Sequence, residues 1–356
     1  MSSSGYYPPS GVYSDSYKKD MRIIKTRKQA ALAIGALIVL LFIPIIPGIN
    51  SPYMLRLVIG TGIAVIICLG LNILTGYCGQ LNIGQSAFVM VGAFTAGLLN
   101  YHLGWSFWVN IIPSGLMAAV FGVIFGAPSV RLKGLYLALT TLAAQIILTW
   151  IALNHIALAS AGFVVDPPAI GDFYFDTPAR FYYIALVFTI GMSFFAKGIA
   201  RSGIGRAFMA IRDNDIAAEA MGINIFKYKL LAFLICTFYA GIGGALFAHY
   251  MMWVQLESFT LTDSVWYVVM IIVGGLGSIE GAFFGVIFVV VLKEIISVFG
   301  PVVEGSMTFL PTGAGSGFLL VGIGGVAILF LMLEPRGIAH RWKIFKTYYR
   351  LWPFGY

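Results

Sequence analysis

The chain has 356 residues, of which 60% are hydrophobic and only 10% are charged. A soluble domain carries about a quarter charged residues, so this chain has too little charge to cover a water-facing surface. The composition therefore excludes a soluble globular protein and predicts a polytopic membrane protein. The net charge of +8 comes from basic residues gathered at the ends of apolar runs, which is typical of membrane topology and argues against a nucleic-acid partner.

Residues 1–17 are rich in Ser, Tyr, Pro and Gly and are expected to be partly disordered, and no cleavable signal peptide is recognisable in them. Three cysteines, Cys68, Cys78 and Cys236, lie in or beside apolar runs and lack the spacing of a metal site. We expect them to be buried small hydrophobic side chains without disulfide bonds.

Ten apolar runs are candidates for membrane spans, because a spanning helix needs about 20 mostly apolar residues. Gly-rich breaks interrupt the runs over 53–101 and 263–299, so the prediction is an all-α membrane protein with about eight to ten transmembrane helices. The candidate spans are residues 29–49, 53–75, 82–101, 106–129, 134–153, 180–197, 229–252, 263–279, 281–299 and 314–333.

The basic residues predict the orientation of these spans. With the N-terminus placed inside, the 22 lysines and arginines all fall on the inner side except Arg56, Arg180 and Lys293. Each exception lies near an outer helix end, where a long side chain can reach the interface. We therefore predict an even number of spans with both termini cytoplasmic. The expected division is a cytoplasmic tail over 1–28, a membrane domain over 29–333 with a cytoplasmic loop at 198–228, and a cytoplasmic tail over 334–356.

Two glycine-rich segments interrupt apolar runs on the predicted inner side, at residues 76–86 (GYCGQLNIGQS) and 274–281 (GGLGSIEG). Irregular backbone is tolerated in lipid only where protein or a water-filled cavity covers it. The first segment is therefore either a broken helix that lines a translocation path or a tight cytoplasmic turn with helix-capping residues. Neither segment has the Lys-Ser/Thr pair of a phosphate-binding loop, so no nucleotide site is expected in this chain.

The candidate path residues are the polar and glycine positions of the first segment, with two threonines inside the fifth predicted span. Those threonines could instead form hydrogen bonds between helices. The candidates are Gly79, Gln80, Asn82, Gln85, Ser86, Thr140 and Thr141.

A mixed-charge segment at residues 198–229 separates two long apolar runs. Its alanines favour a helix, the residues from Asp213 to Asp215 suit a helix N-terminus, and Gly222 is a natural stop. We predict a short helical element over 204–225 that lies along the inner membrane surface. The segment is either a docking site for a partner or an ordinary connecting loop with solvated charges, and its length and helix signals favour docking.

The sequence RSGIGRAFMAIRDNDIAAEAMGINIFKYKLLAF (201–233) closely resembles the cytoplasmic loop of LivM-type permease subunits of branched-chain amino acid ABC importers. Asn82 stands where that family commonly has Ser, and Ala282 where it usually has Pro. The family's glycine pair after the fifth span is missing from SAGFVVDPPAIG (160–171), which adds Asp166 and leaves branched-chain specificity open. Further similar stretches cover 76–99, 130–143, 274–288 and 334–354, so the resemblance extends over about residues 50–354.

The resemblance implies a multi-pass ABC permease of the bacterial inner membrane. Its partners would be a LivH-type permease subunit, two ABC ATPase subunits of the LivG and LivF type, and an extracytoplasmic substrate-binding protein. ATP would be used by the partner subunits, with no cofactor or metal bound by this chain. The loop would be the coupling helix that sits in a groove of the ATPase. The residues assigned to it by resemblance are Arg206, Arg212, Asp213, Glu219, Ala220 and Gly222.

No catalytic constellation is recognisable, and the four histidines lack the spacing of a metal site, so an enzymatic role is not expected. An ion-coupled secondary transporter would need ionisable residues at mid-membrane, and the chain offers few of them. The solute stays open, because branched-chain and other amino acids, urea and short amides are all compatible with the sequence. The partner permease could also be a second copy of this chain.

Overall fold

The computed structural model describes residues 51–132, 134–156, 159–306 and 336–351, together with scattered positions from 31 to 46 and from 324 to 334. Within these residues, eight helices are long and apolar enough to cross a membrane, and each coincides with a predicted span. The predicted spans 29–49 and 314–333 lie largely outside the described residues, as does the predicted tail over 1–28. The structure is therefore that of an all-α polytopic membrane protein.

Residues 51–339 form one compact unit, called here the membrane unit. It begins with α3 (Pro52–Leu71), which continues into a π-helical turn (Asn72–Tyr77). The helices that follow are α4 (Gln85–Leu103), α5 (Phe107–Ser129), α6 (Leu135–His155), α7 (Pro178–Arg201), α8 (Gly203–Asp213), α9 (Asp215–Ala220), α10 (Ile225–Met251), α11 (Leu261–Gly274) and α12 (Ile279–Ser306). Four short strands, β1 (Phe163–Val164), β2 (Ala169–Ile170), β3 (Phe173–Tyr174) and β4 (Trp253–Val254), and a 3-10 turn (Leu256–Ser258) lie in the connections.

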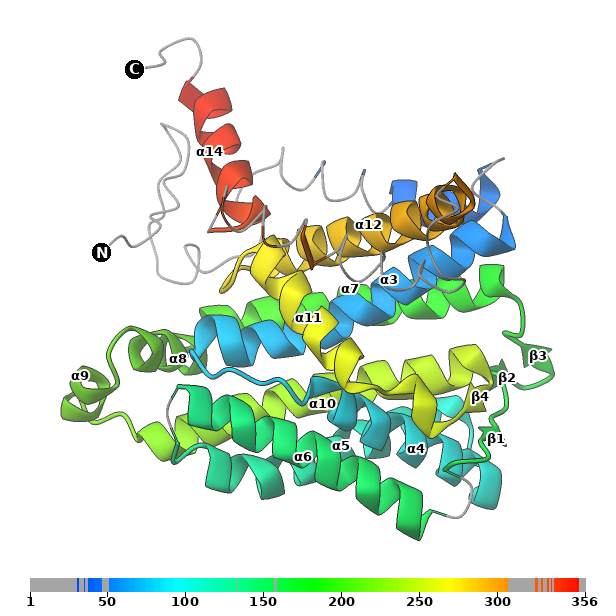
Figure 1. Cartoon of the computed structure of the whole chain (residues 1–356), viewed down its shortest axis with the longest axis horizontal. Helices are drawn as coiled ribbons and strands as arrows, with labels where there is room; N and C mark the ends of the chain where they lie inside the picture. The colour runs from blue at the N-terminus through cyan, green and yellow to red at the C-terminus, as the bar shows by residue number, and fades with distance from the viewer. Residues whose placement is uncertain are drawn as a thin grey trace. The chain divides into compact units, whose positions relative to one another are not determined.

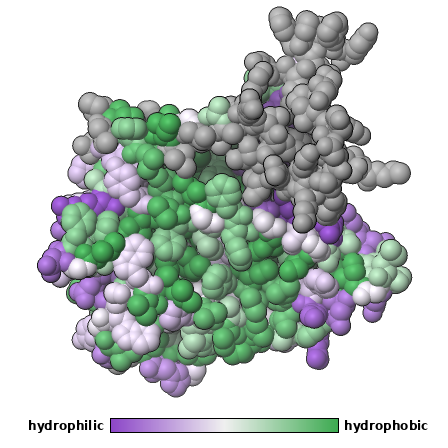
Figure 2. Space-filling model, turned by 180° about the vertical axis from the view of Figure 1, so that it is seen from behind, coloured by the Kyte–Doolittle hydropathy of each residue, from purple (hydrophilic) through white to green (hydrophobic). Residues whose placement is uncertain are grey.

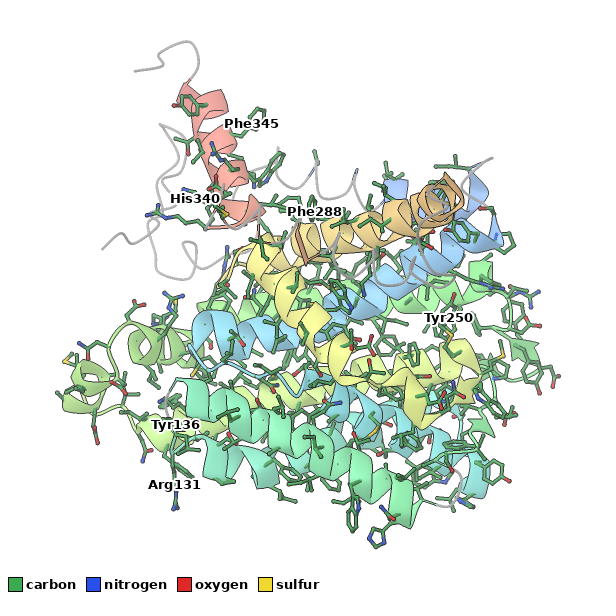
Figure 3. All side chains as sticks on the ribbon, in the orientation of Figure 1. Arg131, Tyr136, Tyr250, Phe288, His340 and Phe345 are labelled. Atoms are coloured by element: carbon green, nitrogen blue, oxygen red, sulfur yellow. The ribbon has the colours of Figure 1, made fainter. Side chains whose placement is uncertain are left out.

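The connections of the membrane unit gather at two opposite ends, with α8 and α9 at one end and the four strands at the other (Figure 1). β1 pairs antiparallel with β4, and β2 pairs antiparallel with β3. Arg131 and Tyr136 lie at the α8–α9 end, whereas Tyr250 lies toward the strand end (Figure 3). The two basic loops predicted to share one membrane side therefore do lie at one end, while the orientation of that end toward the cytoplasm stays a prediction.

The core of the membrane unit is built around α10, which packs against α5, α4 and α3. Glycines make this packing close. A Cβ atom on Gly92 would overlap the backbone of Gly241, and one on Gly244 would overlap the carbonyl oxygen of Val89. In lipid, where apolar burial does not drive helices together, such close backbone approach is a main source of helix association.

The outward faces of the peripheral helices are apolar. On α5, large exposed side chains recur about one turn apart, at Ile112, Leu116, Val120 and Ile124. Figure 2 shows a broad hydrophobic band on one face, bordered at both ends by hydrophilic patches. An apolar band between two polar margins is the surface expected of a protein that faces a bilayer.

The second unit comprises residues 1–50 and 340–356, and α14 (Ile338–Leu351) holds most of its described residues. In α14, Trp342 stacks on Phe345 with ring centroids 5.8 Å apart, and the Nζ atom of Lys346 lies 5.5 Å from the centroid of the Trp342 ring. Basic and aromatic side chains thus share one stretch of this helix, as they do in helices that lie at a membrane interface.

Candidate functional site

The predicted helical element over 204–225 is two helices, α8 and α9, separated by Asn214. Asn214 is extended (φ −160°, ψ 108°), and its Oδ1 accepts a hydrogen bond of 3.1 Å from the backbone nitrogen of Ala217. The prediction of a single element was wrong in this detail, because an Asn side chain that caps the following helix competes with continuation of the preceding one. The predicted stop is confirmed, since α9 ends at Ala220, Met221 is its C-cap and Gly222 follows with a φ of +84°.

Helix α9 lies at one extremity of the membrane unit (Figure 1), and Ala218 is its buried residue. The predicted coupling residues Glu219, Ala220 and Gly222 are all exposed. Two large apolar side chains beside them are also exposed, Ile216 at 74% and Met221 at 83%. Neither residue was predicted from the sequence, although large apolar side chains in a short charged surface helix are a signal of an interaction surface.

The predicted coupling residue Arg212, at the end of α8, ties the α8–α9 segment to the first glycine-rich segment. Its Nη1 donates a hydrogen bond of 2.9 Å to the carbonyl oxygen of Gly76, and its Nε and Nη2 contact Oδ1 of Asp213 at 3.0 and 2.9 Å. The Gly76 carbonyl lies in the π-helical turn at the end of α3, where the α-helical hydrogen-bond pattern is interrupted. By contrast Arg206 is exposed, and its Nη1 contacts the nearby carbonyl oxygen of Arg201 at 3.3 Å.

The same π-helical turn also holds the second glycine-rich segment. Oδ1 of Asn72 accepts a hydrogen bond of 2.9 Å from the backbone nitrogen of Gly277, and its Nδ2 donates one of 2.8 Å to the carbonyl oxygen of Ser278. A Cβ atom on Gly76 would overlap both Asn72 and Gly277, so no larger residue fits between them. The structure therefore places both glycine-rich segments and the end of α8 in direct contact.

A cavity of about 390 Å³ lies beside this contact, lined by residues of four separate segments, among them Gln80, Arg212, Asp213 and Lys229. Gln80 is only 2% exposed, and neither polar atom of its amide has a partner among the described residues. Burial raises the pKa of the neighbouring Cys78 thiol to about 12, against an opposing effect of the Lys229 ammonium. The path candidates Gly79 and Gln80 thus lie next to the predicted coupling residues.

The first glycine-rich segment is neither a continuous helix nor a tight turn. Residues 78–84 are irregular and mostly buried, and α4 begins only at Gln85, well inside the unit (Figure 1). Helices broken in this way are typical of transporters. The helix before the second glycine-rich segment, α11, has 14 residues and is about 21 Å long, so its span reaches membrane length only together with the residues from Leu256 onward.

Side chains from neighbouring helices satisfy the backbone of this break. The amide of Ile83 bonds to Oγ1 of Thr141 on α6 at 3.1 Å, and the amide of Ser86 bonds to Oγ of Ser264 on α11 at 2.8 Å. The amide of Ala87 bonds to Oε1 of Gln145 on α6 at 2.9 Å. Polar groups at membrane depth require such partners, because lipid offers none.

The structure brings most of the candidate path residues into this polar cluster. Asn82, Gln85, Ser86 and Thr141 are each 1% exposed or less. Nδ2 of Asn82 donates to Oε1 of Gln85 at 2.8 Å. Thr140 stands apart, with its hydroxyl bonded to the carbonyl oxygen of Leu137 in the same helix. Ser264 is a member that the sequence analysis missed, since its partner lies 178 residues away in the chain.

Among the residues that the structure describes, no group of three or more His, Cys, Asp or Glu side chains is arranged to hold a metal ion. The three cysteines are free and buried, as predicted.

Comparison with known proteins agrees with this architecture. The family model described as the permease component of branched-chain amino acid transport systems matches residues 53–331. The chain is 31% identical over 304 residues to the high-affinity branched-chain amino acid transport permease LivM of Escherichia coli, covering 78% of this chain and 68% of that protein. It is 24% identical over 313 residues to the probable LivM of Methanocaldococcus jannaschii, covering 78% of this chain and 90% of that protein.

A more distant relative is the guanosine ABC transporter permease NupQ of Bacillus subtilis, 22% identical over 201 residues that cover 48% of this chain and 59% of that protein. No solved structure matches the chain. With a family model over most of the chain and a relative above 30% identity, the chain belongs to the branched-chain amino acid permease family of ABC transporters, as a LivM-type multi-pass protein of the inner membrane.

Proposed function

We propose that this subunit forms one half of the translocation path of an ABC importer for branched-chain or related amino acids. The other half would be a LivH-type permease subunit. Two ATPase subunits of the LivG and LivF type would drive the cycle and use the ATP, and an extracytoplasmic binding protein would deliver the solute. The similarity to LivM proteins along 78% of the chain supports this assignment.

The α8–α9 segment is the proposed contact with an ATPase subunit, which requires that its end of the membrane unit and both chain termini face the cytoplasm. The observation that carries this role is the combination of two features in one short segment. Helix α9 exposes Ile216, Glu219 and Met221, a mixed apolar and acidic surface, and Arg212 directly before it bonds to the end of α3. A push on α9 would therefore reach α3 through α8.

The proposal divides the chain as the sequence predicts. Residues 1–28 and 334–356 would be cytoplasmic tails, and 29–333 the membrane domain with its coupling loop at 198–228. The candidate path residues of the polar cluster would face the path only after the buried break opens, because they are hydrogen-bonded inside this subunit in the present structure.

Uptake by proteoliposomes tests the function directly. The chain is reconstituted with its partner permease, ATPases and binding protein, and uptake of labelled leucine, isoleucine and valine is followed with and without internal ATP. ATP-dependent uptake of these solutes is expected. Uptake that is independent of ATP and follows a proton or sodium gradient would overturn the ABC mechanism. Uptake of urea, short amides or nucleosides without uptake of leucine would overturn the solute class.

A charge reversal tests the coupling segment. Glu219→Lys is expected to weaken ATPase association or coupling by about tenfold while membrane insertion is unchanged, because it places a cation on the exposed face of α9. The matched control is Lys227→Gln, an exposed charge in the first turn of α10. Equal transport by the wild-type and Glu219→Lys complexes would contradict the proposed contact between α9 and an ATPase subunit.

A further inference from the structure

A second cavity, of about 530 Å³, lies at the end of the membrane unit opposite to α8 and α9. Residues 56–64 of α3, residues 175–181 at the start of α7, the last turns of α10 and Tyr267 of α11 form its walls. Its volume falls within the range of about 300–1,000 Å³ that is typical of small-molecule sites. In the proposed orientation this end faces the outside, from which the solute arrives.

His249 is the buried polar side chain in the wall of this cavity, with only 1% of its surface exposed. Its Nδ1 lies 2.7 Å from the carbonyl oxygen of Asp166, and the ring of Phe107 packs edge-on against it at 5.1 Å between centroids. Because a carbonyl oxygen can only accept, Nδ1 carries the hydrogen, which leaves Nε2 of the neutral ring as an acceptor. Nε2 has no hydrogen-bond partner among the described residues, so this buried acceptor is available to a donor group of a bound ligand.

Arg56 supplies a positive charge to the same cavity from the second turn of α3. Within the described part of the chain it forms no ion pair, because Asp176, the carboxylate of this cavity wall, pairs with Arg180 at 3.3 Å. A guanidinium offers two parallel N–H donors, which match the two oxygens of a carboxylate.

The remaining lining is largely apolar. Ile63, Phe181, Phe247 and Met251 all contribute to it, and the ring of Phe181 lies against that of Tyr250 with centroids 5.1 Å apart. An apolar wall with a few convergent polar groups is the usual construction of a site for a small amphiphilic ligand. Among the polar side chains of this wall, which also include Asp176 and the hydroxyls of Thr177, Tyr250 and Tyr267, Arg56 can bind a carboxylate and His249 can accept from an ammonium.

We propose that this cavity binds a zwitterionic amino acid with an apolar side chain. Arg56 binds the carboxylate, Nε2 of His249 accepts a hydrogen bond from the ammonium, and the aliphatic and aromatic residues contact the side chain. The inference rests on the proposed amino acid import and adds a site inside this subunit that holds the solute after its delivery. Solutes without both charges, such as nucleosides and sugars, leave Arg56 and His249 unmatched.

Equilibrium binding to the purified transporter complex, without binding protein or ATP, tests the site. The probes are leucine, isocaproate, which lacks the ammonium, and isoamylamine, which lacks the carboxylate. Leucine is expected to bind at least about tenfold more tightly than either analogue, as befits two charge-assisted hydrogen bonds. Arg56→Gln should remove the advantage of leucine over isoamylamine, and His249→Asn should remove its advantage over isocaproate.

His249→Asn is chosen because the Asn amide can still donate to the carbonyl oxygen of Asp166 while it lacks the Nε2 acceptor. The matched controls are Arg131→Gln, at the opposite end of the unit, and His155→Asn, two exposed residues that do not line the cavity, and both should bind leucine as the wild type does. If His249→Asn fails to fold, the exposed Arg56→Gln variant decides the outcome alone.

Three results would overturn the site: no leucine binding, equal binding of all three probes, or a tightly held phospholipid that is lost in Arg56→Gln. If leucine does not bind but ATP-driven leucine uptake is normal, the cavity is excluded as a leucine site and the proposed function still holds. Failure of uptake itself, measured separately, identifies an error in the proposed function.

Discussion

The guanidinium of Arg212 donates a hydrogen bond of 2.9 Å to the carbonyl oxygen of Gly76, which lies 136 residues earlier in the chain. One bond thus joins the last residues of α8 to the turn that ends α3. That turn in turn holds Gly277 and Ser278 through Asn72. Direct hydrogen bonds therefore join the α8–α9 segment to the end of α3 and the end of α3 to the loop between α11 and α12, and we expect a displacement of the segment to follow this route.

Replacement of Arg212 should uncouple ATP hydrolysis from transport. Arg212→Ala loses the bond to Gly76, and we expect the number of solutes moved per ATP hydrolysed to fall about tenfold while the ATPases remain bound. Arg212→Lys should recover only part of the loss, because a single ammonium cannot reproduce the two-sided contact with Gly76 and Asp213. Uptake and phosphate release measured in the same proteoliposomes check this, and an unchanged ratio in Arg212→Ala would contradict it.

Replacement of Asn72 should destabilise the membrane unit. Asn72→Ala leaves the amide of Gly277 and the carbonyl of Ser278 without their partners, at a cost of about 1–3 kcal/mol for each. Thermal unfolding in detergent micelles measures the loss. The control is Asn154→Ala at an exposed position whose side chain bonds within its own helix, where we expect a change within about 0.5 kcal/mol. Equal midpoints for the two variants would rule out the bridging role.

The glycines between α4 and α10 offer a test of packing. Gly92→Ala forces a methyl group into the backbone of Gly241 and should destabilise the protein by about 1–3 kcal/mol. Gly191→Ala, in α7, places the same methyl group in open space and should be neutral or stabilising by up to about 1 kcal/mol. The denaturant midpoint should thus fall for Gly92→Ala and stay unchanged or rise for Gly191→Ala, and an equal fall in both variants would refute the close approach.

Cys78 should resist alkylation in the folded protein. Its thiol has a pKa of about 12 through burial, against 9.0 in an exposed chain, and the thiolate is the reactive form. In a variant with Cys68→Ala and Cys236→Ala, we expect slow maleimide labelling at pH 7 and fast labelling after unfolding. The folded state keeps a proton that the unfolded chain loses above pH 9, so this group's contribution to stability is present below pH 9 and is lost as the pH rises toward 12. Rapid labelling of the folded protein at neutral pH would contradict the burial.

The eight described spans could be predicted from hydropathy because each is a long apolar run, and their ends differ by a few residues at most helices. The predicted span 82–101 begins three residues before α4, because Asn82 bonds the amide of Gly84 and Oε1 of Gln85 outside the helix. The predicted span 263–279 extends five residues beyond Gly274, where α11 ends. The helix ends there because Gly275 and Gly277 adopt positive φ.

The contacts that build the candidate site could not be predicted in this way. In the sequence, Arg212 is one of several charged residues in a charged segment. Its sequence neighbours do not indicate that its partner is the carbonyl oxygen of Gly76, 136 residues earlier. Ser264 and Gln145 meet the start of α4 only because three helices converge there. Whether these residues couple, bind or conduct stays a prediction.

The start of α4 is held by side chains of two other helices, through Thr141 and Gln145 of α6 and Ser264 of α11. Any swing of α4 must carry those helices along or strip these amides of their acceptors, at several kcal/mol for each amide left bare in a lipid environment. Water that enters the break can take over as the acceptor. Hydration of the break and release of α4 are therefore linked, and each favours the other.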